Sequence, residues 1–199
     1  MYGLVNKAIE DLAVAVGGEE TWLAIKEKAG VDVVAFLSMD AYPDELTYSL
    51  VGAASEVLGM TPDEILEAFG KHWVLYTARG GYGPLLKSAG NSLPEFLSNL
   101  DALHVRVGLT MPKLRPPSFR VQKISESELI VSYYSQRLGL ASMVVGLLKG
   151  VGDMFGQDVT VAHTLNRDSG ADHDEFALTF VPSNLPASET AEIHAAAQA

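Results

Sequence analysis

The sequence predicts an α+β domain in which a helical part precedes a mixed part with an antiparallel sheet and one long helix. Apolar residues recur at three- and four-residue spacings through the first two-thirds of the chain, prolines then interrupt that pattern, and short alternating segments follow. Hydrophobic residues make up 48% and charged residues 20% of the 199 residues. That composition supplies enough apolar material for a core in one domain of ordinary size.

Start and stop signals divide the helical part. Gly3–Val16 ends at two glycines, and a short helix over Thr21–Ala29 ends at Gly30. The next helix ends at Gly59 and has an apolar face formed by Leu46, Leu50, Val51, Ala54, Val57 and Leu58. Thr61 and Ser92 each precede a first turn with a proline and then a glutamate at the third position, which predicts helices from there to about Thr77 and Thr110.

Strand patterns follow Pro112, Pro116 and Pro117. Two strands are predicted over Phe119–Lys123 and Leu129–Tyr134, then an apolar helix over Leu138–Phe155, and then a hairpin of Val159–Leu165 and Phe176–Val181 with the polar connection Asn166–Asp174. Residues 182–199 are rich in alanine and polar residues and are expected to form a flexible tail. We therefore expect one domain over residues 1–181, with subregions of about 1–60 and 61–181.

Charge and composition exclude several classes of function. The net charge of −11 repels phosphate backbones and anionic lipid, so neither nucleic acid nor membrane is an expected partner. Without cysteine there is no thiolate nucleophile, disulfide or iron–sulfur cluster. Glu10 and Asp11 interrupt the segment where a signal peptide needs an apolar run, which favours a cytoplasmic location. The glycine-rich segment Arg79–Pro84 lacks phosphate-loop spacing and is interpreted as a connection.

His104 is the first candidate site residue. It falls on the apolar stripe of its predicted helix and should point inward; the stripe consists of Leu93, Phe96, Leu97, Leu100, Leu103 and Val107. An inward histidine is typically a core residue with hydrogen-bonded ring nitrogens. The alternative is an imidazole that binds a buried cofactor metal, as proximal histidines do for haem iron.

Tyr133, Ser135 and Arg137 form the second candidate, because alternate positions of a strand share one face. They fit the polar outer face of a half-buried strand. They equally fit an anion site, since the arginine fork matches a carboxylate and the two hydroxyls can fill the remaining acceptor positions.

Other histidines are weaker candidates. His72 is one position from Trp73 and about 100° away around the helix, so it should face elsewhere. Four residues of the last hairpin could hold a metal, although a solvated turn explains them better: His163, Asp172, His173 and Asp174.

Taken together, these features resemble the H-NOX family, haem domains that bind nitric oxide or oxygen and occur as stand-alone bacterial sensors and in the β subunit of soluble guanylate cyclase. The resemblance rests on the opening Met1-Tyr2-Gly3-Leu4-Val5-Asn6, the helix with His104, the segment with Pro116 and the Tyr-x-Ser-x-Arg pattern that ends at Arg137. It covers about the first 181 residues and is closest to stand-alone bacterial NO-sensing members.

The resemblance assigns roles by position. His104 matches the proximal haem ligand, and Tyr133, Ser135 and Arg137 match the propionate clamp. Pro116 matches the proline that presses on the haem. The apolar or nearly apolar residues that match the lining of the gas pocket are Val5, Ile9, Trp73, Met143 and Leu147. Ser142 takes the place of the distal tyrosine of O2-binding members, which favours NO because bound O2 gains from a hydrogen-bond donor.

The implied function is a haem b gas sensor, not an enzyme, that binds NO and CO at ferrous iron. Its partner would be a separate histidine kinase or a cyclic-nucleotide signalling enzyme. The family mechanism implies that NO weakens the bond between His104 and iron and that a flatter haem moves against Pro116. The alternatives are a haem-free module, a module in which Arg137 binds an apolar organic anion, an O2-binding member of the same family, and a haem-dependent enzyme.

Overall fold

Helices precede strands in the computed structural model, which describes residues 1–183 except for the side chains of residues 78 and 79. The helices before the sheet are α1 (Gly3–Ala29), α2 (Asp44–Leu58), α3 (Pro62–Thr77), the π-helix η1 (Ala78–Tyr82), α4 (Gly83–Lys87), α5 (Leu93–Ser98) and α6 (Leu100–Gly108). The mixed part contains β1 (Ser118–Lys123), β2 (Glu128–Tyr134), α7 (Ala141–Met154), β3 (Gln157–Leu165), the short 3-10 helix η2 (Arg167–Ser169) and β4 (Asp174–Pro182). The predicted α+β class is confirmed.

Glycines end or bend the first helices where the sequence indicates. Gly18 has φ 78° and ψ 179° inside α1, so the two predicted helices are joined through a kink. Gly30 and Gly59 follow α1 and α2 with φ 64° and 66°. These left-handed conformations favour glycine, which lacks the Cβ that would clash.

The capping motif at Thr61 forms as predicted. The Thr61 backbone N–H donates to Glu64 Oε2 over 2.8 Å, and the Glu64 N–H donates back to Thr61 Oγ1 over 3.2 Å. The predicted connection Arg79–Pro84 lies mostly in the π-helix η1, which joins α3 to the short helix α4.

The helix predicted from Ser92 to Thr110 is wrong in one respect: Asn99 breaks it into α5 and α6. Asn99 adopts φ −99° and ψ 4°, and its side-chain amide donates to the carbonyl of Ala89 over 2.8 Å. This hydrogen bond to an earlier loop competes with continuation of the helix.

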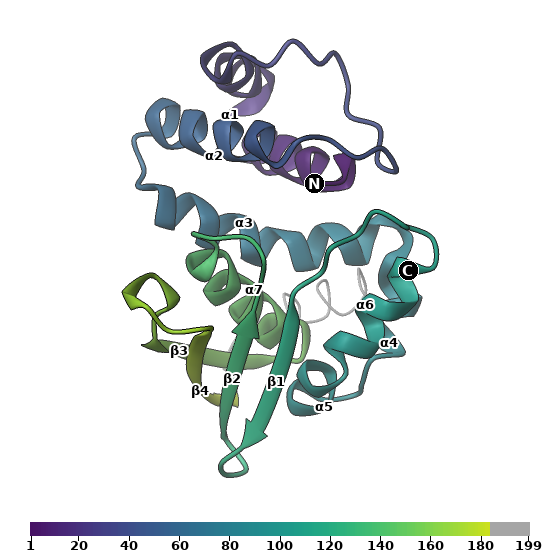
Figure 1. The fold of residues 1–199 in the computed structure, drawn as a ribbon, viewed down its shortest axis with the longest axis vertical. Coiled ribbons are helices and arrows are strands. Elements are labelled where there is room, and N and C mark those ends of the chain that lie inside the picture. Colours follow the sequence, from purple (N-terminus) through teal and green to yellow (C-terminus); the bar gives the residue numbers. More distant parts are fainter. Residues whose placement is uncertain (184–199) are drawn as a thin grey trace.

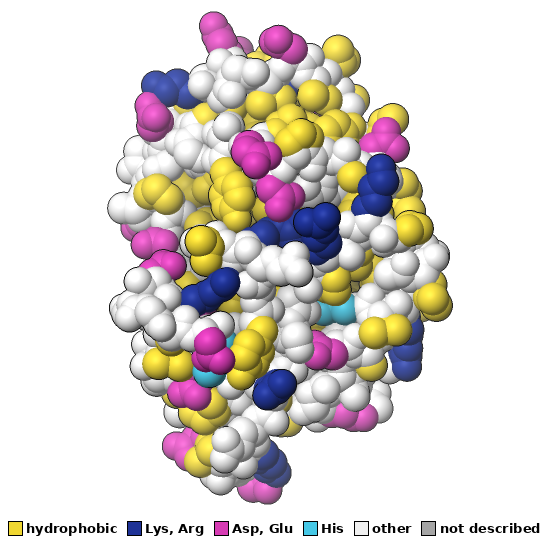
Figure 2. Space-filling model, in the orientation of Figure 1, with side chains coloured by type: hydrophobic (Ala, Val, Ile, Leu, Met, Phe, Trp, Pro, Cys, Tyr) yellow, Lys and Arg dark blue, Asp and Glu magenta, His cyan; other side chains and the backbone are white. Residues whose placement is uncertain are grey.

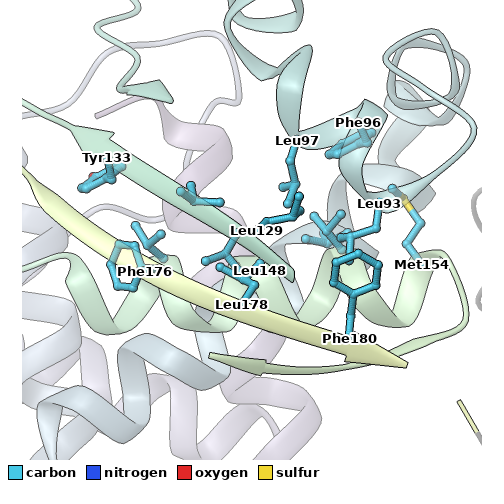
Figure 3. Close-up of a cluster of buried hydrophobic side chains, with 14 of the residues drawn as sticks. Leu93, Phe96, Leu97, Leu129, Tyr133, Leu148, Met154, Phe176, Leu178 and Phe180 are labelled. Carbon is cyan, nitrogen blue, oxygen red and sulfur yellow. The ribbon is translucent and has the colours of Figure 1, made fainter. Parts of the chain in front are cut away.

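The four strands pair antiparallel in the order β1-β2-β4-β3. Figure 1 shows α7 behind this sheet, α4 to α6 beside it, and α1 and α2 stacked beyond α3. The larger apolar core lies between the sheet, α7 and α5, and Figure 3 shows Leu129, Phe176 and Leu178 of the strands with Leu148 of α7. A second core joins α1, α2 and α3 around Ile25 and Leu50.

Helices α3 and α7 touch through glycines. A methyl group on Gly70 would lie 2.1 Å from the Met143 carbonyl oxygen, and one on Gly146 would lie 1.9 Å from that of Glu67. Polar links also join the two helices: Ser142 to Asp63, Lys149 to Glu67 and Lys71 to Asp153. The two helices therefore have little freedom to move relative to each other.

The predicted division at residue 60 and the domain limit at 181 stay predictions. Of the predicted tail, Pro182 ends β4 and Ser183 donates its N–H to the Gly156 carbonyl, while residues 184–199 lie outside the described residues. In residues 1–183 no helix is long and apolar enough to cross a membrane.

Candidate functional site

A cavity of about 940 Å³ lies between the two parts of the fold. That volume is near the upper end of ligand cavities, which span roughly 300–1,000 Å³. The ten predicted site residues all line it, although they come from six separate segments of the chain: Val5, Ile9, Trp73, His104, Pro116, Tyr133, Ser135, Arg137, Met143 and Leu147.

His104 enters the cavity from α6. Its Nδ1 is fully shielded and makes no hydrogen bond of normal geometry with the described residues. Burial lowers the pKa of the His104 imidazole below its usual value, although Asp101 and the Pro117 carbonyl act in the opposite direction. The lowered pKa favours the neutral ring, the form in which an imidazole can bind a metal.

The proline-rich segment beside α6 is held from two sides. The Lys113 N–H donates to the Tyr2 hydroxyl over 2.9 Å, which ties the segment to the beginning of α1. Arg137 Nη1 donates to the Arg115 carbonyl over 2.8 Å. Pro116 follows Lys113 and Arg115 in the chain and forms part of the cavity wall.

Tyr133, Ser135 and Arg137 all reach the cavity, but not from one strand face. Strand β2 ends at Tyr134, so Ser135 and Arg137 lie in the following loop, where the Arg137 N–H donates to Ser135 Oγ over 3.1 Å. Tyr133 is 5% exposed, and burial raises the pKa of its hydroxyl. The prediction of a shared strand face is therefore wrong for two of the three residues, since the strand stops before them.

Asp44 is a site residue that the sequence reasoning missed. Arg137 binds it twice, with Nε 2.7 Å from Oδ2 and Nη2 3.3 Å from Oδ1. Burial acts to raise the pKa of Asp44, but hydrogen bonds and charges from Arg137 and the terminal ammonium of Met1 together hold it below its usual value. Asp44 opens α2, and 93 residues separate it from Arg137, so local patterns could not pair them.

The apolar wall comes from α1, α3 and α7. Val5, Ile9, Trp73, Met143 and Leu147 line the cavity there, and the Trp73 ring lies 6.1 Å from Phe69 and 6.4 Å from Tyr76. Such a wall excludes water and offers a bound molecule mainly apolar contact.

The structure corrects the expectation for Ser142. Its hydroxyl donates to Asp63 Oδ1 over 2.6 Å, and it lies outside the cavity lining. The neighbouring Met143 faces the cavity, because successive helix positions point about 100° apart.

The other histidines within residues 1–183 do not line the cavity. His72 points away from it as predicted, with Nε2 2.7 Å from Asp11. His163 pairs with Asp174 and His173 with Asp172, and no group of three metal-binding side chains occurs among the described residues.

Positive charge gathers at the cavity although the chain is acidic. Lys113, Arg115 and Arg137 line it, and Figure 2 shows Lys and Arg side chains together near the middle of this face, over the loop that leads into β1. An apolar cavity with a cationic rim suits a ligand that is apolar over most of its surface and carries carboxylates at one edge.

Comparisons with known proteins agree with this geometry. Residues 2–163 match the model of a family described as Haem-NO-binding. Soluble guanylate cyclase gcy-32 of Caenorhabditis elegans is 33% identical over 165 residues, which are 81% of this chain. This chain spans about a quarter of that relative, 24% of its length.

Two solved structures share the fold. An H-NOX protein from S. oneidensis in the Fe(II)NO ligation state superposes with a TM-score of 0.82 at 22% identity, over 91% of this chain and 99% of that chain. The Fe(II) unliganded H-NOX protein from K. algicida has a TM-score of 0.76 at 18% identity, over 94% and 100% of the two chains.

Proposed function

Because the chain belongs to the Haem-NO-binding family, whose H-NOX domains are gas-sensing haem domains and not enzymes, we propose that it senses NO through ferrous haem b. CO is the second diatomic ligand, and the signal passes to a separate protein. The single observation that carries the proposal is the cavity, which places an imidazole, an arginine with two hydroxyls and an apolar wall around one space.

The residues present fit haem. His104 lines the cavity, and burial lowers the pKa of its imidazole, which favours the neutral form that can bind a metal. The apolar wall suits a porphyrin face, and the cationic rim suits two propionates. Haem, when bound, would supply an iron that His104 could hold and at which a diatomic gas could bind.

Each residue then has a distinct role. His104 binds the iron, and Pro116 shapes the cavity wall beside it. Arg137 has five N–H donors, of which the contacts with Asp44 and Arg115 use three, so donors remain for a carboxylate. Tyr133 and Ser135 add hydroxyls to the same anion site.

The apolar wall sets the choice of gas. Bound O2 acquires partial negative charge and gains from a hydrogen-bond donor, whereas NO and CO bind ferrous iron well without one. Of the residues assigned to this wall, Trp73 alone carries an N–H, and the hydroxyl of Ser142 is directed to Asp63. We therefore propose NO and CO as ligands and no stable O2 complex.

We propose a histidine kinase or a cyclic-nucleotide signalling enzyme as the partner. One relative is named a soluble guanylate cyclase, and this chain matches about a quarter of it, 24%. A domain of that kind transmits a signal only if a partner distinguishes its ligand states.

Absorption spectra of the purified, haem-reconstituted protein test the proposal. The reduced protein should show a Soret band that shifts with NO and with CO and stays unchanged in air before oxidation. His104→Gly should lose haem or need added imidazole to retain it, while His72→Gly, outside the cavity, should keep the wild-type spectrum. A protein that takes up no haem but retains an apolar carboxylate would instead support the anion-binding alternative.

A further inference from the structure

Arg167 lies in η2, in the connection between β3 and β4. Its guanidinium reaches back to the loop of residues 135–140 between β2 and α7, here called the clamp loop because it carries Ser135 and Arg137. Nη1 donates to the backbone carbonyls of Ser135 and Arg137, over 2.5 Å and 3.4 Å. These two residues are assigned to the anion site, and they follow the end of β2. Arg167 itself is partly buried and does not line the cavity.

The position of Arg167 is set by its own surroundings. Its backbone N–H donates to Asp174 Oδ1 over 3.0 Å, and the same oxygen lies 2.9 Å from His163 Nε2. Asp174 is 7% exposed, so these hydrogen bonds are shielded from water. The Asn166 side chain caps the turn by accepting the Asp168 N–H over 2.7 Å.

The clamp loop needs such a support because the sheet does not supply one. In β2 the register with β4 ends at the pair Tyr133 and Asp174, so the carbonyls of Ser135 and Arg137 have no strand partner. The Arg137 side chain forms hydrogen bonds with the Asp44 carboxylate and the Arg115 carbonyl, on the opposite side of the loop from Arg167. Arg167 opposes a shift of the loop by fixing its backbone from the other side.

We propose that Arg167 is a positioning residue for the anion site. In this role Arg167 does not contact the bound carboxylate; it holds the loop so that Ser135 and Arg137 face the cavity. Its positive charge also lies beside Arg137, in a chain whose net charge of −11 otherwise repels an anion. The inference rests on the proposed function, because it assigns Arg167 to the binding of haem propionates. The sequence alone placed this residue in the polar connection Asn166–Asp174.

The rate of haem loss to an excess of a haem-scavenging protein tests the role. Arg167→Met should lose haem about three- to tenfold faster than wild type. The substitution should displace the loop and so weaken, without removing, the charge-assisted hydrogen bond from Arg137 to a propionate. Arg120→Met is the matched control: it removes one arginine that stacks on Tyr134 and leaves the cavity lining unchanged. Its rate should stay within about twofold of wild type.

Three further comparisons distinguish a positioning role of Arg167 from a general contribution to the stability of the fold. With the dimethyl ester of haem, which carries no propionate charge, Arg167→Met should lose the ligand at the wild-type rate. In the Arg137→Ala background, which by itself should shed haem about tenfold to hundredfold faster, adding Arg167→Met should change the rate less than about twofold. Arg167→Lys keeps the charge and one donor nitrogen, and it should show a smaller acceleration with haem and none with the ester.

Equal acceleration with haem and with its ester, or the same acceleration in the Arg137→Ala background, would overturn the inference, because the residue would then act on the whole fold. Wild-type rates in both Arg167 variants would overturn it as well. If Arg167→Met does not fold, the same comparison is made with Arg167→Lys: faster loss of haem but not of its ester supports the inference, and any other result overturns it. A rate in Arg137→Ala equal to wild type would refute the clamp of the proposed function, and with it this role.

Discussion

The cavity has one wall on α3 and α7 and another on α6, and the two are built differently. Helices α3 and α7 meet backbone to backbone at Gly70 and Gly146 and are joined by three polar links along their length. Helix α6 has nine residues, of which Leu103 alone is buried; Val105 is 70% exposed, and Leu109, which follows the helix, is 81% exposed.

This difference indicates where the molecule can respond to a ligand. Displacing α3 against α7 would force backbone atoms together. Helix α6 is held by side-chain hydrogen bonds: the Asp101 carboxylate accepts the Ser118 hydroxyl over 2.6 Å and the Phe119 N–H over 2.8 Å, and Arg106 donates to the Ser88 hydroxyl over 2.7 Å. We expect the α3–α7 wall to hold its shape and the wall that carries His104 to move.

The largest effect should come from the glycine contact between α3 and α7. Gly146→Ala places a methyl group 1.9 Å from the Glu67 carbonyl oxygen, so the helices must separate. We expect a loss of about 3 kcal/mol in the free energy of unfolding, measured with urea. Gly108→Ala at the end of α6 meets no atom within 4 Å and should cost less than about 0.5 kcal/mol. Equal losses of unfolding free energy in Gly146→Ala and Gly108→Ala would show that the α3–α7 wall is no more tightly packed than the α6 wall.

Met143→Tyr tests whether the fixed wall can hold a hydrogen-bond donor in place. Met143 lines the cavity, so the phenol should donate to O2 and slow its release from the reduced, haem-loaded protein about tenfold, worth about 1.4 kcal/mol. Ser142→Tyr is the matched control, since that side chain points to Asp63. A slower release in the control than in Met143→Tyr would show that α7 is rotated relative to the structure described here.

Asp101→Ala should loosen α6 alone. It removes the acceptor of the Phe119 N–H and should lower local stability by about 1 kcal/mol. Hydrogen exchange of α6 amides should accelerate several-fold while that of α3 and α7 stays unchanged. Asp153→Ala removes a comparable carboxylate link to Lys71 on the other wall and should change exchange there far less. Acceleration spread over all three helices would contradict the independence of α6.

The smallest expected effect is on the pH dependence of stability, through the ion pair between Asp44 of α2 and Arg137. A carboxyl whose pKa falls on folding stabilises the folded state above its unfolded pKa, near 4, and this stabilisation is lost as pH falls through the folded pKa. Wild-type protein should therefore lose more stability between pH 5 and about 3 than Asp44→Asn, measured by urea unfolding. Glu45→Gln, which removes an acidic residue without a salt bridge in the described chain, should keep the wild-type slope. Parallel slopes for wild type and Asp44→Asn would show that the pair with Arg137 contributes nothing.

Local patterns in the sequence determined the element types, their caps and the inward direction of His104. Capping at Thr61 depends on residues three apart, and glycine stops depend on a single φ angle. The direction of His104 depends on its spacing from Leu100 and Val107 within α6. Each could therefore be predicted without the rest of the fold. The positions that resemble H-NOX domains also line one cavity, while their individual roles stay predictions.

Contacts between distant segments were decided only by the tertiary structure. The amide of Asn99 bonds to Ala89 and ends a helix that its own residues favour, and Asp44 meets Arg137 across 93 positions. Arg167 supports a loop 30 residues earlier in the chain. Periodicity and capping report on neighbours within about four residues along the chain, whereas these hydrogen bonds depend on how whole helices and strands pack, which no local pattern encodes.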